Sequence, residues 1–340
     1  MFVDNMNELL VTQHGVKLGK KSERFFVSGE KIDEEIPASD LGLIIINSNV
    51  NITSSAIQLA AEHNIPIHIG DKYGNPLSTI YPTDIAGNPE LKIQQLKFRE
   101  TNEGLSIAKK FAKASIVNRG KMMTSLGRTR DNQSLKEKGK EILKLKEKFK
   151  EIKGELNRKN RETIMNIEGR GAKKYYKKLT EILPEDIFEG KRKRKPPRDC
   201  FNAALSYGYG VLYPRVHKSV IYAGLNPYLS FLHAEYGRRP GLVMDLVEEF
   251  RQPVVDRAVI NLSIRGQLSS EDVSAKENGV LLNKQGRKKV ADEVLDKLSS
   301  EKKHRGEKTK IKRHIRNQSI LLANHILKDK TYKPFMPRRM

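Results

Sequence analysis

The N-terminal part of the chain, from Leu9 to Tyr81, consists of short apolar runs separated by Gly, Pro, Asn and Ser. Such runs between turn formers predict β-strands. The run LGLIIIN from Leu41 is continuously apolar and predicts a strand buried on both faces. One helix is predicted from Ala56 to His63, after the capping run Thr53-Ser54-Ser55 and before Pro66. The remaining predicted strands are LLVT, VKLGKK, RFFVSG, EKIDEEIP, NIT, PIHIG and LSTIYP.

From Leu91 onward the apolar residues recur at helical spacing. The Lys- and Glu-rich stretch 134–160 predicts one long amphipathic helix, with a solvated charged face or, alternatively, a face that contacts DNA. Residues 201–222 predict a buried helix rich in small and aromatic residues. We therefore expect an α+β protein: a β-rich domain (1–83), a linker (84–90), a larger all-α domain (91–330) and a flexible basic tail (331–340).

Two further helices are predicted between Asn226 and Arg257. Asn226-Pro227 is typical of a helix start, and this helix would carry His233 and end near Gly237. The next would begin after Pro240-Gly241, with an apolar stripe on one side and acids on the other. Asp245 and Glu248 are three residues apart, so their carboxylates are neighbours on one face. Two such acids suit a divalent cation between them, although taken alone the pair is explained more simply by the solvated face of an amphipathic helix.

The charge of the whole chain makes a metal site at these acids more plausible than the acidic pair alone does. The chain of 340 residues holds 64 Lys and Arg against 41 Asp and Glu, a net charge of +23. Such a surface attracts phosphate backbones, and an acidic pocket within it is typical of a metal-dependent nuclease. The single cysteine, Cys200, excludes an internal disulfide. No apolar run is long enough to span a bilayer or to act as a secretion signal, so we expect an intracellular, cytoplasmic protein.

Other candidate residues lie upstream of the acidic pair. Glu168 precedes a basic and aromatic stretch and is either a metal ligand or a partner in a local ion pair. The run KRKRKPPR (191–198) fits a nuclear-import signal, a phosphate-gripping loop or a solvated linker. His217 is expected at the surface, and Cys200 is expected to be structural.

Several motifs together resemble one family. They are IEGRGAKKYY from Ile167, PPRDCFNAALSYGYGVLY from Pro196, AGLNPYLSFLH from Ala223 and GRRPGLVMDLVEEFRQPVVDR from Gly237. In this order, and with LGLIIINSNVNITSSAIQLAAEHNIPIHIG upstream, they resemble the CRISPR-associated spacer integrases, the Cas-one family. The likeness spans residues 8–265. It departs from the usual pattern at Cys200, Asn226 and Ser230, none of which is a ligand position.

The resemblance implies a β-rich dimerisation domain and a helical catalytic domain. It implies that Glu168, His233 and Glu248 are catalytic and bind Mg²⁺ or Mn²⁺, with Asp245 as a supporting acid. It further implies homodimers, two of which bracket a dimer of the small Cas-two partner on double-stranded DNA and CRISPR repeat DNA. Around this site we expect DNA contacts from the following residues: Arg170, Lys173, Tyr175, Arg238, Arg239 and Arg251.

The expected activity is that of a metal-dependent endonuclease and integrase that joins short foreign DNA fragments into a CRISPR array. A DNA 3′-hydroxyl would attack a phosphodiester during joining, and water would attack during hydrolysis. A transposon-type integrase or a branched-DNA repair nuclease could use the same site. A basic nucleic-acid-binding scaffold without catalysis is a further alternative.

Overall fold

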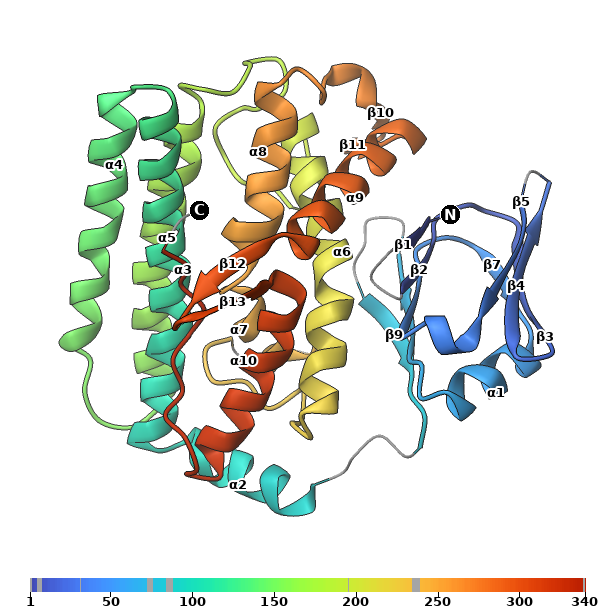
Figure 1. Cartoon of the computed structure of the whole chain (residues 1–340). Coiled ribbons are helices and arrows are strands. Elements are labelled where there is room, and N and C mark those ends of the chain that lie inside the picture. The colour runs from blue at the N-terminus through green and yellow to red at the C-terminus, as the bar shows by residue number, and fades with distance from the viewer. Residues whose placement is uncertain are drawn as a thin grey trace. The chain divides into compact units, whose positions relative to one another are not determined.

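The computed structural model describes residues 2–4, 8–30, 32–71, 76–83, 88–194, 196–233, 239–338 and 340. The chain divides into two units, Met1–Gly87 and Asn88–Met340. The first is rich in strands and the second in helices (Figure 1), which confirms the predicted α+β class. The division falls within the predicted linker, part of which lies outside the described residues, and helix α2 already begins at Pro89.

The described residues of the first unit form two sheets, one α-helix and a short 3-10 helix at Ala38–Asp40. β6 (Leu43–Ile46) lies parallel between β2 (Glu8–Val11) and β8 (Ile67–Gly70), and all four of its residues are buried, as the sequence predicts. Helix α1 (Ser54–Glu62) begins at Thr53, whose side chain accepts the Ala56 amide. β1 (Phe2–Asp4) and β9 (Pro76–Ile80) complete the five-stranded sheet; the four-stranded sheet contains β5 (Ile32–Pro37), β4 (Arg24–Gly29), β3 (Val16–Lys21) and β7 (Val50–Ile52).

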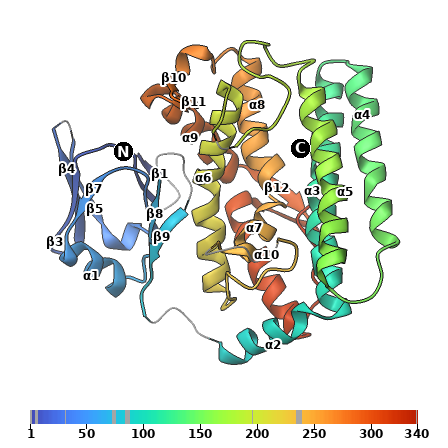
Figure 2. The same cartoon turned by 180° about the vertical axis from the view of Figure 1, so that it is seen from behind.

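The second unit is built around helix α3 (Asn102–Thr129), the longest helix described. α4 (Gln133–Lys144) and α5 (Arg158–Leu179) lie alongside it, as both views show (Figures 1 and 2). The other helices are α2 (Pro89–Arg99), α6 (Cys200–Tyr222), α7 (Gly241–Val247), α8 (Arg257–Ile264), α9 (Lys284–Ser299) and α10 (Ile311–Ile326). Two hairpins, β10 (Val273–Lys276) with β11 (Gly279–Leu282) and β12 (Glu301–His304) with β13 (Glu307–Lys310), interrupt the C-terminal helices.

Three predicted elements differ in the structure. The helix predicted over 134–160 is interrupted: α4 ends at Lys144, a 3-10 helix continues from Leu145 to Lys150, and a bend with Gly154 at φ +89° precedes α5. Residues 226–233 form turns and bends in place of a helix. The predicted flexible tail is anchored in its described part, 331–338: Tyr332 and Phe335 are fully buried, because their aromatic rings fill space beside α3 and α10. Within the described residues, no helix is long and apolar enough to cross a membrane.

Candidate metal centre

One face of α3 contacts the carboxylates of both Glu168 and Glu248. Ser115 and Arg119 are four residues apart and therefore point the same way. The Ser115 hydroxyl lies 3.2 Å from Glu168 Oε1 on α5 and 2.8 Å from Glu248 Oε2 at the end of α7. The Arg119 guanidinium pairs with Glu168 and lies 3.9 Å from Glu248 Oε2. The structure therefore brings Glu168 and Glu248, 80 positions apart in the sequence (248 − 168), to one serine and one arginine.

A second buried arginine holds the other oxygen of Glu248. Arg251 Nη1 lies 2.8 Å from Glu248 Oε1, and its Nη2 donates to the Tyr213 hydroxyl at 3.0 Å. The guanidinium also lies over the Tyr209 ring, 5.1 Å from its centroid. Burial raises the pKa of Glu248, but Arg251 and Arg119 outweigh burial and hold that pKa well below its usual range. Glu248 is therefore an ionised carboxylate in a buried, polar setting.

Asp245 fixes the position of His233. It is fully buried, and its Oδ1 accepts hydrogen bonds from the His233 amide at 2.9 Å and from His233 Nδ1 at 2.8 Å. Its Oδ2 accepts the amides of Phe231 and Leu232 at 2.7 and 3.0 Å. These amides bond a carboxylate and not the carbonyls four residues earlier, which is why no helix forms here. The arrangement directs His233 Nε2 toward Glu248 Oε1, 4.0 Å away.

The donor atoms present suit a hard divalent cation. Two carboxylates and one imidazole form an incomplete shell that leaves room for water and phosphate oxygens. A ligating histidine commonly donates its other ring N–H to a carboxylate, as His233 does to Asp245. Among the described residues, no three His, Cys, Asp or Glu side chains already converge on one metal position. Arg119 and Arg251 instead supply the positive charge that the carboxylates need.

The residues expected to contact DNA divide into two groups. Arg170 and Lys173 on α5 are exposed, as is Arg239 before α7. Tyr175 is fully buried and Arg251 is 4% exposed, so neither side chain is available to DNA in this structure. They are buried because Tyr175 fills the core and Arg251 pairs with Glu248. Arg238 lies outside the described residues.

Other buried polar groups were not expected. The predicted polar face of the helix after Pro240 lies in the interior, where Glu249, Gln252 and Asp256 are at most 1% exposed. His217 is also buried, which lowers its pKa to about 4. The sequence analysis did not identify Ser115 and Arg119. Their position on the apolar side of α3 could have indicated them, because a buried arginine needs an acidic partner. Cys200 is buried and its thiol donates to the Ser269 carbonyl, consistent with a structural role.

Comparisons with known proteins agree with this architecture. A CRISPR-associated protein Cas1 from Methanobrevibacter ruminantium is 28% identical over 95% of this chain and 96% of its own. A CRISPR-associated endonuclease Cas1 from Methanopyrus kandleri is 35% identical over 70% of each chain. A casposase bound to its integration product is 25% identical, with a TM-score of 0.83 over 98% of this chain and 94% of the casposase.

The fold match extends to a Cas1 protein from Thermotoga maritima. Its structure has a TM-score of 0.81 and 22% identity, and the match covers 96% of this chain and 98% of that one. The family model for CRISPR-associated protein Cas1 matches residues 9–295, a range that covers most of both units and all four candidate site residues. The chain therefore belongs to the CRISPR-associated Cas1 family.

Proposed function

We propose that this protein is a metal-dependent DNA endonuclease and integrase that inserts short foreign DNA fragments into a CRISPR array. One observation carries the proposal. Asp245 holds His233 by Nδ1, so that Nε2 faces Glu248, while Ser115 joins Glu248 to Glu168. We infer from these contacts that the imidazole and the two carboxylates, which come from α5, the loop before α7 and the end of α7, are ligands of one cation. The family relatives named endonucleases support a nuclease or integrase activity.

The chain's own residues prepare the chemistry. Glu168, His233 and Glu248 would hold Mg²⁺ or Mn²⁺, and the bound cation would supply the positive charge that polarises a phosphodiester and stabilises a leaving 3′ oxygen. Asp245 keeps the imidazole oriented through Nδ1, so that the lone pair of Nε2 is offered to the site. Ser115 keeps the two carboxylates side by side. Arg119 and Arg251 compensate the buried negative charge, and the attacking group is a DNA 3′-hydroxyl or water.

The surface beside the site suits a DNA strand. A hollow of about 800 Å³ lies along the N-terminal half of α5, the helix that also carries Glu168. Three cations line it against one acid, together with polar and apolar side chains: Lys148, Lys153, Arg170, Glu151, Asn160, Thr163, Asn166, Ile152 and Ile167. Cationic and amide donors of this kind bind phosphate oxygens without reading sequence. We propose that Arg170, with Lys173 and Arg239, contacts DNA near the reacting phosphate.

The proposed assembly is a homodimer, two copies of which bracket a dimer of the small Cas2 protein. The β-rich unit would form the dimer contact. Support comes from a neighbour whose fold matches at a TM-score of 0.82 and which belongs to a Cas6-RT-Cas1–Cas2 complex. The DNA substrate would be a double-stranded fragment with 3′ ends, joined to CRISPR repeat DNA.

A transposon-type integrase is the second candidate function, because the casposase of the same fold is bound to an integration product. The same three ligands would serve that reaction. A branched-DNA repair nuclease would also use them, whereas a non-catalytic scaffold would not need them. The target DNA distinguishes the first two: the main proposal requires joining at a CRISPR repeat, and the alternative requires joining at transposon target sites.

The test is joining of a labelled short duplex to a supercoiled plasmid that carries a repeat, with Mg²⁺, Mn²⁺ or EDTA and with or without the Cas2 partner. We expect Glu168→Ala, His233→Ala and Glu248→Ala each to lower joining by at least ~100-fold. Glu162→Ala is the matched control, since this acid is on the same helix and, within the described residues, forms its ion pair with exposed Arg158. Unchanged joining in the three site variants, or full joining in EDTA, would show that the acids are structural.

A further inference from the structure

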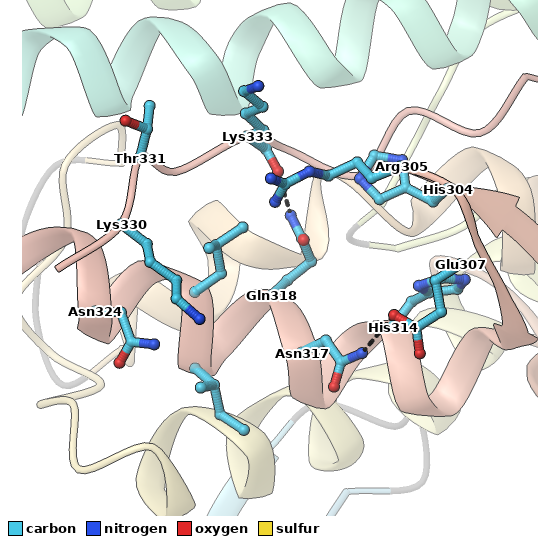
Figure 3. Close-up of a pocket in the computed structure, with 12 residues that line it drawn as sticks. His304, Arg305, Glu307, His314, Asn317, Gln318, Asn324, Lys330, Thr331 and Lys333 are labelled. Atoms are coloured by element: carbon cyan, nitrogen blue, oxygen red, sulfur yellow. Dashed lines mark hydrogen bonds between the residues drawn. The ribbon is translucent and has the colours of Figure 1, made fainter.

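A pocket that includes neither Glu168 nor Glu248 lies between the β12–β13 hairpin, α10 and the C-terminal segment, the residues that follow α10. Its volume is about 540 Å³, within the range of ~300–1,000 Å³ that ligand sites occupy. Arg305 and Lys330 point into it from opposite sides, with Gln318 in the back wall (Figure 3). The following residues complete the lining: His304, Glu307, His314, Asn317, Ile320, Leu321, Asn324, Thr331 and Lys333.

The charge of this pocket is unbalanced. Within the described residues, neither Arg305 nor Lys330 nor Lys333 has a carboxylate partner. The one acid in the lining, Glu307, lies 3.8 Å from Arg313 and accepts a hydrogen bond from Asn317 at 3.4 Å. Arg305 and Lys330 are therefore two cations directed into one hollow, which attracts an anion.

The shape of the pocket and its uncharged lining side chains indicate which class of anion it could bind. Asn324 and Thr331 can donate hydrogen bonds to phosphate or to a base edge, and Ile320 and Leu321 provide an apolar surface for a sugar or a base. The Nε2 atom of His304 is buried and has no hydrogen-bond partner among the described residues, so the wall holds an unsatisfied polar group. A free phosphate would leave the apolar side uncovered, and a duplex is too wide to enter.

We propose that this pocket binds a nucleotide of single-stranded DNA, with Arg305 and Lys330 on adjacent phosphates. The inference rests on the proposed function, because it supplies a second contact for the DNA on which the protein acts. It adds a site outside the metal centre, formed by the hairpin and the C-terminal segment. An acidic peptide of a partner protein has the same charge but lacks a ring to cover Ile320 and Leu321.

The pocket is also connected to the metal centre. Gln318 Nε2 donates to Lys333 O at 3.0 Å and to Glu249 Oε2 at 2.8 Å, and Glu249 follows Glu248 directly in the chain. Phe335 N donates to the same oxygen of Glu249 at 2.7 Å. The pocket wall and the C-terminal segment are therefore attached to the residue beside the proposed ligand. A bound strand would stabilise this connection.

The experiment measures binding in EDTA, so that catalysis plays no part. A labelled 12-nucleotide single strand, a duplex of the same length and a poly-glutamate peptide are titrated against the intact chain by fluorescence anisotropy. Arg305→Gln with Lys330→Gln is compared with Lys303→Gln and Lys310→Gln, which remove the same charge from exposed positions of the same hairpin. Circular dichroism and thermal unfolding establish that both double variants are folded.

We expect the pocket variant to bind the single strand at least ~10-fold more weakly and the control less than ~2-fold more weakly. The slope of log affinity against log salt should fall by about 1.4 for two lost phosphate contacts. Equal losses in both variants would overturn the proposal, and so would a loss confined to the peptide. Glu168→Ala should bind the strand normally here even though it is expected to fail in joining, which separates this inference from the proposed function.

Discussion

Replacing Asp245 with asparagine separates a positioning carboxylate from a metal ligand. Both carboxylate oxygens already accept two N–H donors each, three from the backbone of 231–233 and one from His233 Nδ1. Asparagine keeps the shape but offers one oxygen, so its NH₂ group faces two of those donors. Each buried donor left without an acceptor costs about 1–3 kcal/mol, so we expect a loss of about 2–6 kcal/mol in unfolding free energy.

The second expected effect is on metal affinity. Without a charged partner at Nδ1, His233 loses its fixed orientation, and changes of this kind lower metal affinity about 10–100-fold. Urea unfolding in EDTA measures the first effect, and calorimetric titration with Mn²⁺ measures the second. Asp186→Asn is the control, because this aspartate is exposed and should change unfolding free energy by less than about 0.5 kcal/mol.

The two measurements decide between the roles. A positioning role requires destabilisation in the absence of any metal, together with weaker Mn²⁺ binding. If Asp245→Asn abolished Mn²⁺ binding but unfolded in EDTA at the same urea concentration as the unmodified protein, Asp245 would be a direct ligand. The reasoning from its four hydrogen bonds would then be refuted.

Three further changes test other parts of the account. Burial raises the pKa of Glu249 to about 7, above the ordinary 4.5, so the folded protein binds a proton at Glu249 more tightly than the unfolded chain does. The free energy of unfolding should therefore fall as pH rises from 4.5 to 7, by up to about 1.4 kcal/mol per pH unit. Urea unfolding of Glu249→Gln should lack this pH dependence. Ser115→Ala removes the hydroxyl that joins the two carboxylates and should weaken Mn²⁺ binding at least ~10-fold in a titration, whereas unchanged affinity would contradict the bridge. Phe335→Ala should lower unfolding free energy by about 3–5 kcal/mol because the ring is fully buried, while Tyr228→Ala, at a 52% exposed ring, should cost under about 1 kcal/mol by the same method; equal costs would mean that the C-terminal segment does not pack.

Local patterns predicted the first unit well. Strand lengths and faces depend on alternation and turn residues nearby in the sequence, and Thr53 caps α1 through an amide three residues away. The buried helix over 201–222 is likewise confirmed as α6, one residue longer at its start. In both cases, the residues that decide the structure are neighbours in the chain.

The site could be predicted only in part. The types and spacing of the acids identified Asp245 and Glu248, but no sequence pattern shows that Asp245 takes amides from a loop 12 to 14 positions earlier. That long-range capture replaces the helix expected around His233. Likewise, the acids after Pro240 match an exposed polar face by periodicity, yet Arg119 from α3 and Arg251 make burial of Glu248 possible. The missing helix around His233 and the burial of Glu248 both depend on residues that are not neighbours in the sequence.

The C-terminal segment shows the same limit. Its basic composition predicts a loose tail, whereas two aromatic rings among the charges anchor it. Asn118 on α3 donates to the Phe335 carbonyl at 3.1 Å, and Lys121 donates to the Pro337 carbonyl at 2.7 Å. The average composition of a segment does not show which single residues anchor it. Tyr332 and Phe335, two aromatic residues in a basic segment, were the available sign.

The central claim is that Glu168, His233 and Glu248 share one divalent cation. A crystal structure of the protein with Mn²⁺, with an anomalous difference map collected near the manganese edge, tests it most directly. We expect one peak about 2.1 Å from His233 Nε2 and from a carboxylate oxygen of each glutamate. A map with no peak there, with Arg119 still paired to Glu168 at saturating Mn²⁺, would contradict it.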